Sequence, residues 1–368
     1  MSESFLELHD VTKTFGATAA VERVFLEIRK GEFFTLLGPS GCGKTTTLRV
    51  LAGLEEPDQG EIYLDGEPLT VGSRGLHVPP EKRNMGLVPQ SYAVWPHLSV
   101  FENVAYPLKL RRWKEADIRQ QVSQILSLVG LGGLENRSAT LLSGGQQQRV
   151  AMARALVYSP VVLLMDEPLS NLDAKLRDQM REELKSLQRK TGVTVIFVTH
   201  DQTEAMSLSD RIAVMNSGRV EQVGEAEEVY DRPVTPFVRD FLGTTFVLHA
   251  KFAGRDSCNS LRLELASSEG SSAVLAGNRA ARVGELVKGA PVAVCVRPEQ
   301  VTLTMRPEET NSIAGAIESL LFVGDHYECR VSIGADRLLV HVPRSQKPEI
   351  GSKVFLNLRK EGITVWPR

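Results

Sequence analysis

A glycine-rich segment that ends in a lysine and a threonine is the first place where this sequence could do chemistry. The segment GPSGCGKT spans residues 38–45 and follows the apolar run FFTLL. Backbone N–H groups of such a loop, placed at a helix N-terminus, form a nest for an anion. Lys44 would reach the β- and γ-phosphates of a nucleotide, and the Thr45 hydroxyl would ligate Mg²⁺. We therefore predict a phosphate-binding loop, with a chance glycine-rich turn as the alternative.

Acidic and imidazole side chains follow two nearly unbroken apolar runs, residues 161–165 and 193–198. Runs of this kind are typical of strands buried on both faces of a parallel sheet, whose carboxyl ends form the ligand edge. Asp166 would hold Mg²⁺ there, directly or through water, and Glu167 would act as general base on the attacking water. If the two strands are neighbours, His200 would reach the γ-phosphate. Capping of the next helix by the acids, and a structural His200, are the alternatives.

The run LSGGQQQR, residues 142–149, predicts a helix N-terminus that faces an anion. Ser143 and the N–H groups of Gly144 and Gly145 would supply unpaired donors and partial positive charge. An ordinary N-cap serine before a glutamine-rich helix is the alternative. This run resembles the signature motif of ABC-type ATPases, which largely belongs to that one class of phosphate-binding protein.

The other motifs of that family occur in the same order over roughly residues 4–240. Gln90 resembles the loop glutamine that contacts Mg²⁺ and water, and His200 resembles the switch histidine. SNLD, residues 170–173, resembles the loop that crosses between subunits. Phe15 resembles the aromatic residue that stacks on adenine, although an ordinary apolar strand end is possible there.

The resemblance implies ATP and Mg²⁺ as ligands and assigns a complete site. The implied catalytic residues are Glu167, His200 and Gln90, and the implied Mg²⁺ ligands are Thr45, Gln90 and Asp166. The implied ATP-binding residues are Phe15, Gly38, Pro39, Ser40, Gly41, Cys42, Gly43, Lys44, Thr45, Thr46, Ser143, Gly144, Gly145 and Gln146. We expect Cys42 to be a small loop residue rather than a reactive thiol. The family also implies a head-to-tail dimer, in which each ATP lies between the phosphate loop of one subunit and Ser143 of the other.

Within the family, the sequence resembles the importer ATPases. The short separation of Gln90 and Ser143 leaves no room for a long coiled coil, and the chain carries one ATPase unit and no fused membrane domain. The importer branch implies two integral-membrane permease subunits, an indirectly associated solute-binding protein, and a peripheral location on the cytoplasmic face of the bacterial inner membrane. Residues 91–108 resemble the docking region for the permease. We expect Tyr92 and Trp95 to be exposed anchors for a coupling helix, or else to pack inside the helical subdomain.

The periodicity changes near residue 236, which predicts two domains. An α/β P-loop domain, residues 1–235, would contain a helical subdomain at about 91–158. A linker, 236–245, would lead to an all-β, OB-like domain, 246–368. That domain resembles the TOBE regulatory barrel of maltose, polyamine and ferric-iron importer ATPases, and VRPEQV at 296–301 matches one of its motifs. The Trp95–Pro96 pair resembles the ferric-iron and phosphonate importers more than the sugar importers, in which Tyr or Phe precedes the proline. Our expected solutes are ferric iron or polyamine, with sugar or phosphonate as alternatives.

Composition limits the remaining possibilities. The 368 residues carry 43 basic and 45 acidic side chains, a net charge of −2, so no electrostatic case exists for nucleic acid as a partner. The four cysteines lack metal or disulfide spacing, which fits a reducing compartment. The N-terminus has no signal-peptide pattern, and no apolar run approaches the length of a membrane helix.

Two functions outside import also remain open. In one, the β domain binds a transcription factor or a phosphotransfer protein and reports transport status. In the other, a soluble ATPase remodels a partner unrelated to transport.

Overall fold

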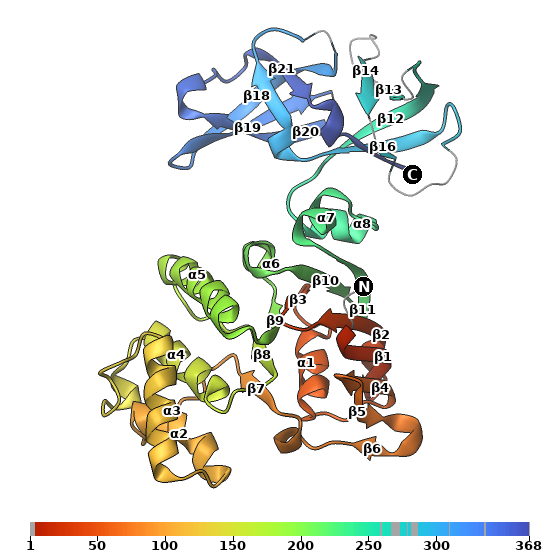
Figure 1. Cartoon of the computed structure of the whole chain (residues 1–368). Coiled ribbons are helices and arrows are strands. Elements are labelled where there is room, and N and C mark those ends of the chain that lie inside the picture. Colours follow the sequence, from red (N-terminus) through yellow and green to blue (C-terminus); the bar gives the residue numbers. More distant parts are fainter. Residues whose placement is uncertain are drawn as a thin grey trace. The chain divides into compact units, whose positions relative to one another are not determined.

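The computed structural model describes residues 4–257, 260–265, 273–277, 279–280, 286–308, 310–334 and 336–367. The chain forms two compact units, Met1–Asp231 and Arg232–Arg368; in Figure 1 the colours run from red to green through the first and from green to blue through the second. Helix α8 (Pro236–Phe241) lies inside the segment expected to be a linker and belongs to the second unit. Cys258 lies outside the described residues.

A six-stranded sheet is the centre of the first unit. Its order is β11 (Arg219–Gly224), β10 (Arg211–Asn216), β3 (Phe33–Leu37), β9 (Thr194–Thr199), β8 (Val162–Asp166) and β7 (Met85–Val88). All neighbours are parallel except β11 and β10. Every residue of β3 and β9 is buried, as expected for apolar strands covered on both faces. β8 and β9 pair as predicted, with Asp166 opposite Val198, so the acids and His200 follow neighbouring strands.

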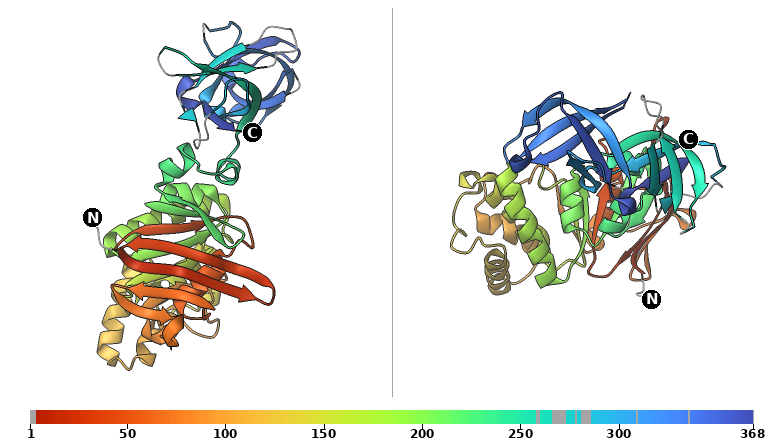
Figure 2. Two further views of the ribbon diagram at one scale, coloured as in Figure 1. Left: turned by 90° about the vertical axis from the view of Figure 1, so that its right-hand side faces the viewer. Right: turned by 90° about the horizontal axis from the view of Figure 1, so that it is seen from above.

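A second, antiparallel sheet has the order β2 (Thr18–Arg29), β1 (Ser4–Phe15), β4 (Gln59–Leu64), β5 (Glu67–Val71) and β6 (Leu76–His77). The predicted Asp65–Gly66 hairpin turn joins β4 to β5. Helix α1 (Lys44–Ala52) lies between this sheet and the first one in both Figures 1 and 2. Its Leu48 and Leu51 share one core with residues of β1, β2, β8 and β9.

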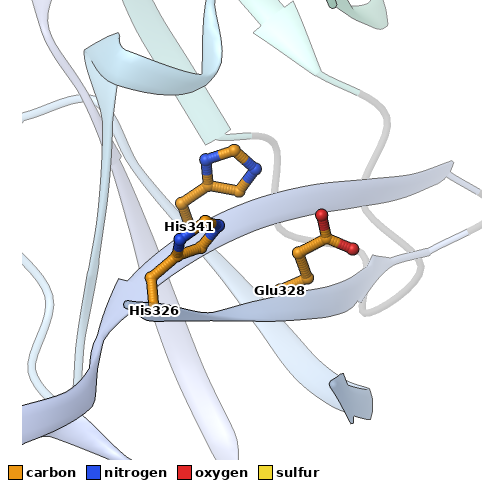
Figure 3. A group of neighbouring side chains, drawn as sticks. All are labelled: His326, Glu328 and His341. Atoms are coloured by element: carbon orange, nitrogen blue, oxygen red, sulfur yellow. The ribbon is translucent and has the colours of Figure 1, made fainter. Parts of the chain in front are cut away.

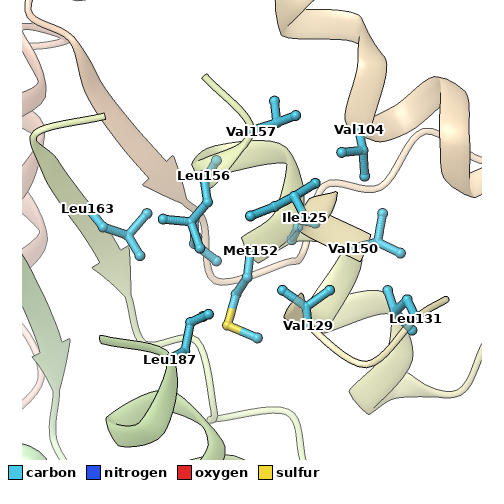
Figure 4. Packing of buried hydrophobic residues seen from close by; sticks show 14 of the residues in the cluster. Val104, Ile125, Val129, Leu131, Val150, Met152, Leu156, Val157, Leu163 and Leu187 are labelled. Atoms are coloured by element: carbon cyan, nitrogen blue, oxygen red, sulfur yellow. The ribbon is translucent and has the colours of Figure 1, made fainter. Parts of the chain in front are cut away.

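A helical subdomain lies beside β7 at the edge of the first sheet (Figure 1). It contains α2 (Val100–Leu110), α3 (Glu115–Leu128) and α4 (Gly144–Leu156), and α5 (Ala174–Thr191) packs against it. The predicted apolar faces of the helices meet in one cluster, which Figure 4 shows around Met152. Two short helices, α6 (Gln202–Leu208) and α7 (Ala226–Asp231), complete the unit.

The described part of the second unit consists mainly of β-strands, as the sequence predicts, with α8 and short 3-10 turns besides. One sheet has the order β14 (Ala273–Gly277), β13 (Leu261–Leu265), β12 (Phe246–Arg255), β16 (Pro291–Val296), β22 (Thr364–Pro367) and β15 (Arg279–Ala280). The other has the order β17 (Val301–Thr304), β21 (Lys353–Leu358), β18 (Ser312–Phe322), β19 (His326–Ile333) and β20 (Asp336–Pro343). Alternating apolar residues of both sheets close a single core. None of the helices in the described part of the chain is both long and apolar enough to span a membrane.

Candidate functional site

The glycine-rich segment forms a tight loop between β3 and α1. Gly41 and Gly43 have φ angles of 80° and 105°, a left-handed backbone that L side chains rarely adopt. A Cβ atom on Gly43 would lie 2.1 Å from the carbonyl oxygen of Ala20. Gly43 is also the N-cap of α1, and its carbonyl accepts the first helical bond from Thr47. The first turn of α1 therefore opens directly from a loop that only glycine can form.

Lys44 is buried and directed back into this loop. Its Nζ donates to the carbonyls of Gly38 and Pro39, at 2.8 and 2.9 Å. Within the described residues no carboxylate forms an ion pair with it. Its Nζ also lies 3.8 Å from the Cys42 Sγ. A buried ammonium with only neutral partners favours the approach of an anion. Cys42 is also buried, and burial raises the pKa of its thiol, as expected for a small loop residue rather than a nucleophile.

Two oxygen ligands lie side by side where the loop meets β8. The Thr45 hydroxyl donates to Asp166 at 2.8 Å, across the gap between α1 and the strand end. Burial raises the pKa of Asp166, and the charge of Glu167 adds to the increase while the Thr45 hydrogen bond opposes it. A hydroxyl and a carboxylate are the hard donors that Mg²⁺ prefers. These two residues therefore fit a divalent ion at the mouth of the loop.

Glu167 is the residue on which the predicted catalytic side chains converge. Its Oε2 lies 3.4 Å from Gln90 Nε2 and 3.1 Å from His200 Nδ1. The three residues follow β7, β8 and β9, so the parallel sheet itself brings them together. Glu167 has a φ angle of 42°, and its N–H donates to the Val198 carbonyl. The left-handed backbone turns the carboxylate out of the strand direction at a strained position, which is common at functional sites.

Asn171 fixes Gln90 in this arrangement, a role that sequence reasoning missed. Its amide donates to the Gln90 carbonyl at 3.0 Å, across a large gap in the sequence. The segment 170–173 was assigned only to contacts between subunits. The structure adds a contact within one chain, for which the sequence gives no signal beyond the motif itself.

Ser143 caps α4 and lies apart from the phosphate loop. Its hydroxyl accepts from the Gln146 N–H, and the Gln146 side chain accepts from the Ser143 N–H, a reciprocal capping box. Ser143 and Gly144 are exposed, whereas Gly145 packs on Leu176 of α5. Within the described part of one chain, no hydrogen bond joins this helix end to residues 38–45. Within the described part of one chain, this helix end and residues 38–45 thus form two separate walls.

The remaining predicted ATP-binding residues lie around the loop and at the end of β1. Phe15 ends β1 with 51% of its surface exposed, and the Lys13 ammonium lies 5.4 Å from its ring centre. An exposed ring of this kind is available for stacking rather than for the core. Ser40 is exposed, and Thr46 is half-buried in the first turn of α1.

The expectation that Tyr92 and Trp95 are exposed is wrong, because both are half-buried. The Arg154 guanidinium lies 4.5 Å from the Trp95 ring centre and donates to the carbonyls of Tyr92 and Ala93. It thereby holds this segment against α4. Tyr106, whose ring centre lies 4.6 Å from that of Trp95 in a tilted arrangement, is the more exposed aromatic, at 41%.

Arg83 is a second residue that the sequence does not single out. It is almost fully buried and donates to the carbonyls of Val50 and Leu51 in the last turn of α1, and also to Thr70. Burial lowers its pKa to about 10. Its neighbours Glu81 and Lys82 are charged, a pattern that is typical of an exposed loop. The sequence therefore gives no sign that Arg83 is buried.

Comparison with known proteins identifies the family. Residues 21–170 match the ABC transporter family, and residues 294–366 match the TOBE domain. The chain is 43% identical to a spermidine/putrescine import ATP-binding protein of Acidothermus cellulolyticus, over 97% of this chain and 92% of that protein. The chain belongs to the ABC import ATPases.

Other relatives of this ABC ATPase are named for the import of different solutes. It is 40% identical to an Fe(3+) ions import ATP-binding protein of Pectobacterium atrosepticum, over 99% of this chain and 97% of that protein. It is 56% identical to a trehalose/maltose import ATP-binding protein of Thermococcus litoralis, over 65% of this chain and 64% of that protein.

A solved structure agrees with this assignment of the first unit. It is cbiO1 from Clostridium perfringens, part of the ABC transporter complex cbiONQ. The two share 29% identity and a TM-score of 0.57, over 62% of this chain and 91% of that chain. As an ABC import ATPase, the chain binds ATP and couples its hydrolysis to solute import, together with membrane permease subunits.

Proposed function

We propose that this ABC ATPase works as a head-to-tail homodimer in which Glu167 is the general base for ATP hydrolysis. The convergence of Gln90 and His200 on one oxygen of Glu167, next to the Thr45–Asp166 pair, is the observation that carries the proposal. A carboxylate held in this way can accept a proton from a water at the γ-phosphate.

Each residue of the loop has a distinct task in this proposal. Lys44 exchanges its carbonyl partners for phosphate oxygens, and the first turn of α1 points its N–H groups at the same anion. Thr45 and Asp166, with Gln90, would hold Mg²⁺, which supplies charge neutralisation on the phosphates when bound. His200 donates toward the γ-phosphate from Nδ1 or Nε2, according to its tautomer.

The second wall of each site comes from the other copy of the chain. The exposed cap of α4, Ser143 with Gly144, supports this arrangement because it presents an anion-binding helix end to solvent. Phe15 would stack on adenine from the first copy.

For the assembly, we propose two integral-membrane permease subunits, contacted by residues 91–108, and a solute-binding protein on the other side of the membrane. The ATPase would lie peripherally on the cytoplasmic face of the bacterial inner membrane. The exposed ring of Tyr106, supported by Trp95 and Arg154, offers an apolar anchor within this segment.

For the solute, we propose ferric iron or a polyamine, because relatives named for the import of those solutes match nearly the whole chain. Uptake of labelled polyamine or iron by vesicles that contain the ATPase and its permease would test this. Uptake of a sugar or phosphonate instead would contradict it.

The substitution Glu167→Gln tests the catalytic proposal. The variant should keep ATP binding, lose roughly 10²–10⁴-fold in hydrolysis, and accumulate as an ATP-bound dimer, because the amide cannot accept the proton. ATP turnover and size-exclusion chromatography of the purified variant measure both effects. Glu182→Gln, at an exposed position of α5, is the matched control and should behave as wild type. Near-normal turnover in Glu167→Gln would exclude Glu167 as the base.

A further inference from the structure

The second unit carries a group of metal-ligating side chains far in sequence from the ATP site. Among the described residues, His326, Glu328 and His341 each offer one ligand atom, and these atoms lie within 4.8 Å of one another. Figure 3 shows the three side chains on the paired strands β19 and β20. Nothing in the proposed ATPase mechanism uses them.

The strand register explains why these residues meet. Glu328 lies directly opposite His341, and His326 is two residues before Glu328 on the same strand. Because side chains alternate along a strand, all three project from the same face of the ribbon. Cys329, which follows Glu328, faces the buried core together with Val340 and Val342, which flank His341. The ligand group is therefore fixed by a ribbon that the core already holds in register.

His326 has the surroundings of a metal ligand. Its Nδ1 lies 2.7 Å from the Asp325 carboxylate, which favours the tautomer with a proton on Nδ1 and a free lone pair on Nε2. That Nε2 atom has almost no solvent contact and, in the described part of the chain, no hydrogen-bond partner. A buried nitrogen lone pair without a donor is unfavourable, and a cation would satisfy it. The His341 ring lies 4.5 Å away, centre to centre.

We infer that His326, Glu328 and His341 form a binding site for a divalent first-row transition metal ion of the Zn²⁺ class, with Asp325 orienting His326. Two imidazoles and one carboxylate suit Zn²⁺, Co²⁺ and Fe²⁺, whereas Mg²⁺ and Ca²⁺ prefer oxygen ligands alone. Ligand atoms on one such ion lie at most about 4.2 Å apart, twice a bond of about 2.1 Å. Binding therefore needs only a small inward movement of the three side chains.

Three protein ligands leave room for water on the ion, so binding is reversible rather than structural. The core of this unit closes through apolar residues of both sheets and does not depend on the ion. The site thus gives the second unit a way to take up a metal ion that is independent of the ATP chemistry.

Titration of the nucleotide-free, full-length protein with Zn²⁺ tests the inference, with millimolar Mg²⁺ present to mask the ATP site. Wild type should bind one equivalent, and Co²⁺ should produce a visible absorption band. His326→Ala and His341→Ala should each weaken binding at least tenfold. Asp325→Asn should weaken it about 10–100-fold, as is usual for a residue that orients a ligand.

Two further variants keep the test independent of folding. Glu328→Gln is nearly isosteric and should also lose affinity while melting as wild type. His249→Ala removes a half-exposed histidine of the same unit that lies near Asp336 instead, and it should bind Zn²⁺ normally. The proposal would be overturned if wild type bound no Zn²⁺ at Zn²⁺ concentrations below about 100 μM, or bound it only with the millimolar-range affinity typical of adventitious contact. Equal affinity in all variants would also overturn it.

Discussion

Asp166 carries its carboxylate in a partly buried position next to a second acid. Its pKa is raised above the ordinary value of 3.8, chiefly by burial. The folded state therefore binds the Asp166 proton more tightly than the unfolded state does. This difference in proton affinity stabilises the folded state, and the stabilisation has its full value at pH values below the ordinary pKa. It is lost as the pH rises through the higher folded-state value. At neutral pH the ionised side chain costs stability in the empty subunit.

The substitution Asp166→Asn should therefore raise the melting temperature of the nucleotide-free subunit at pH 7 by a few degrees, while ATP hydrolysis is lost. The gain should shrink as the pH falls toward 4, where the wild-type carboxylate becomes protonated. Scanning calorimetry at several pH values measures this. Asp117→Asn, at an exposed helix position, should show no such trend. A variant that melts below wild type at pH 7 would contradict the prediction.

At the residue scale, sequence spacing identifies the types of group but not their contacts. Asp166, Glu167 and His200 can be located because each follows a buried apolar run, and the sheet places such positions at one edge. The left-handed backbone of Glu167 cannot be read from its type, because glutamate rarely adopts it. The contact of Asn171 with the Gln90 carbonyl depends on how two distant loops pack.

Among the elements, α1 is held at both ends by unusual residues. The helix begins after Gly43 in the phosphate loop, and the buried Arg83 side chain donates hydrogen bonds to carbonyls in its last turn. Arg83 keeps its charge at neutral pH, since its pKa of about 10 remains well above 7. The far end of the helix that presents Lys44 and Thr45 is thus held by the Arg83 side chain together with the backbone N–H of Gly53, which also donates to the Val50 carbonyl.

Arg83→Ala should lower the free energy of unfolding of the first unit by about 3 kcal/mol or more, because it leaves buried carbonyls unpaired and opens a cavity. Arg83→Lys should recover only part of this loss, since an ammonium lacks the planar fork of donors. Urea unfolding followed by tryptophan fluorescence measures the difference. Lys82→Ala is the adjacent exposed control. A loss below 1 kcal/mol for Arg83→Ala would show that the bonds are replaced by water.

The segment 91–108 should transmit ATP closure to the permease, with Tyr106 as its exposed anchor. Tyr106→Ala should leave ATP binding and melting of the isolated subunit nearly unchanged. It should weaken assembly with the permease by about 2 kcal/mol, roughly thirtyfold. Trp95→Ala should weaken assembly and also lower the melting temperature, because Trp95 packs against Arg154. Co-purification and melting of the same variants measure both effects.

Leu128→Ala, at an exposed position of α3, is the control for that experiment. Lost stability with normal assembly in both aromatic variants would make the segment part of the helical core only.

At the scale of elements, the apolar runs and the Asp65–Gly66 turn predict strands and hairpin well, since those signals are local. The burial of Tyr92 and Trp95 is not predictable in this way, because it depends on Arg154 of a later helix.

For the whole molecule, the separation of Lys44 and Ser143 into two walls predicts that activity is shared between copies. Lys44→Ala and Ser143→Arg should each be inactive alone. Mixed in equal amounts, they should form heterodimers with one intact and one doubly altered site. Random pairing would restore about one quarter of wild-type activity, since half of the dimers would hold one good site.

ATPase assays on the mixture, compared with each variant mixed with itself, measure this recovery. A monomer that hydrolyses ATP at the full rate would contradict sharing. The division into two units follows from the change of periodicity in the sequence, because helical and strand patterns differ in period. The position of the boundary does not, since α8 belongs to the β unit through contacts of Arg239 with Cys295 and Trp366.

The contact of Lys44 with its own loop has a consequence for repeated turnover. When products leave, the ammonium can return to the carbonyls of Gly38 and Pro39 instead of remaining bare. Between one nucleotide and the next, the carbonyls of the loop therefore take the place of the phosphate oxygens as partners of Lys44. An enzyme built in this way would start each cycle with the Lys44 side chain already directed into the loop.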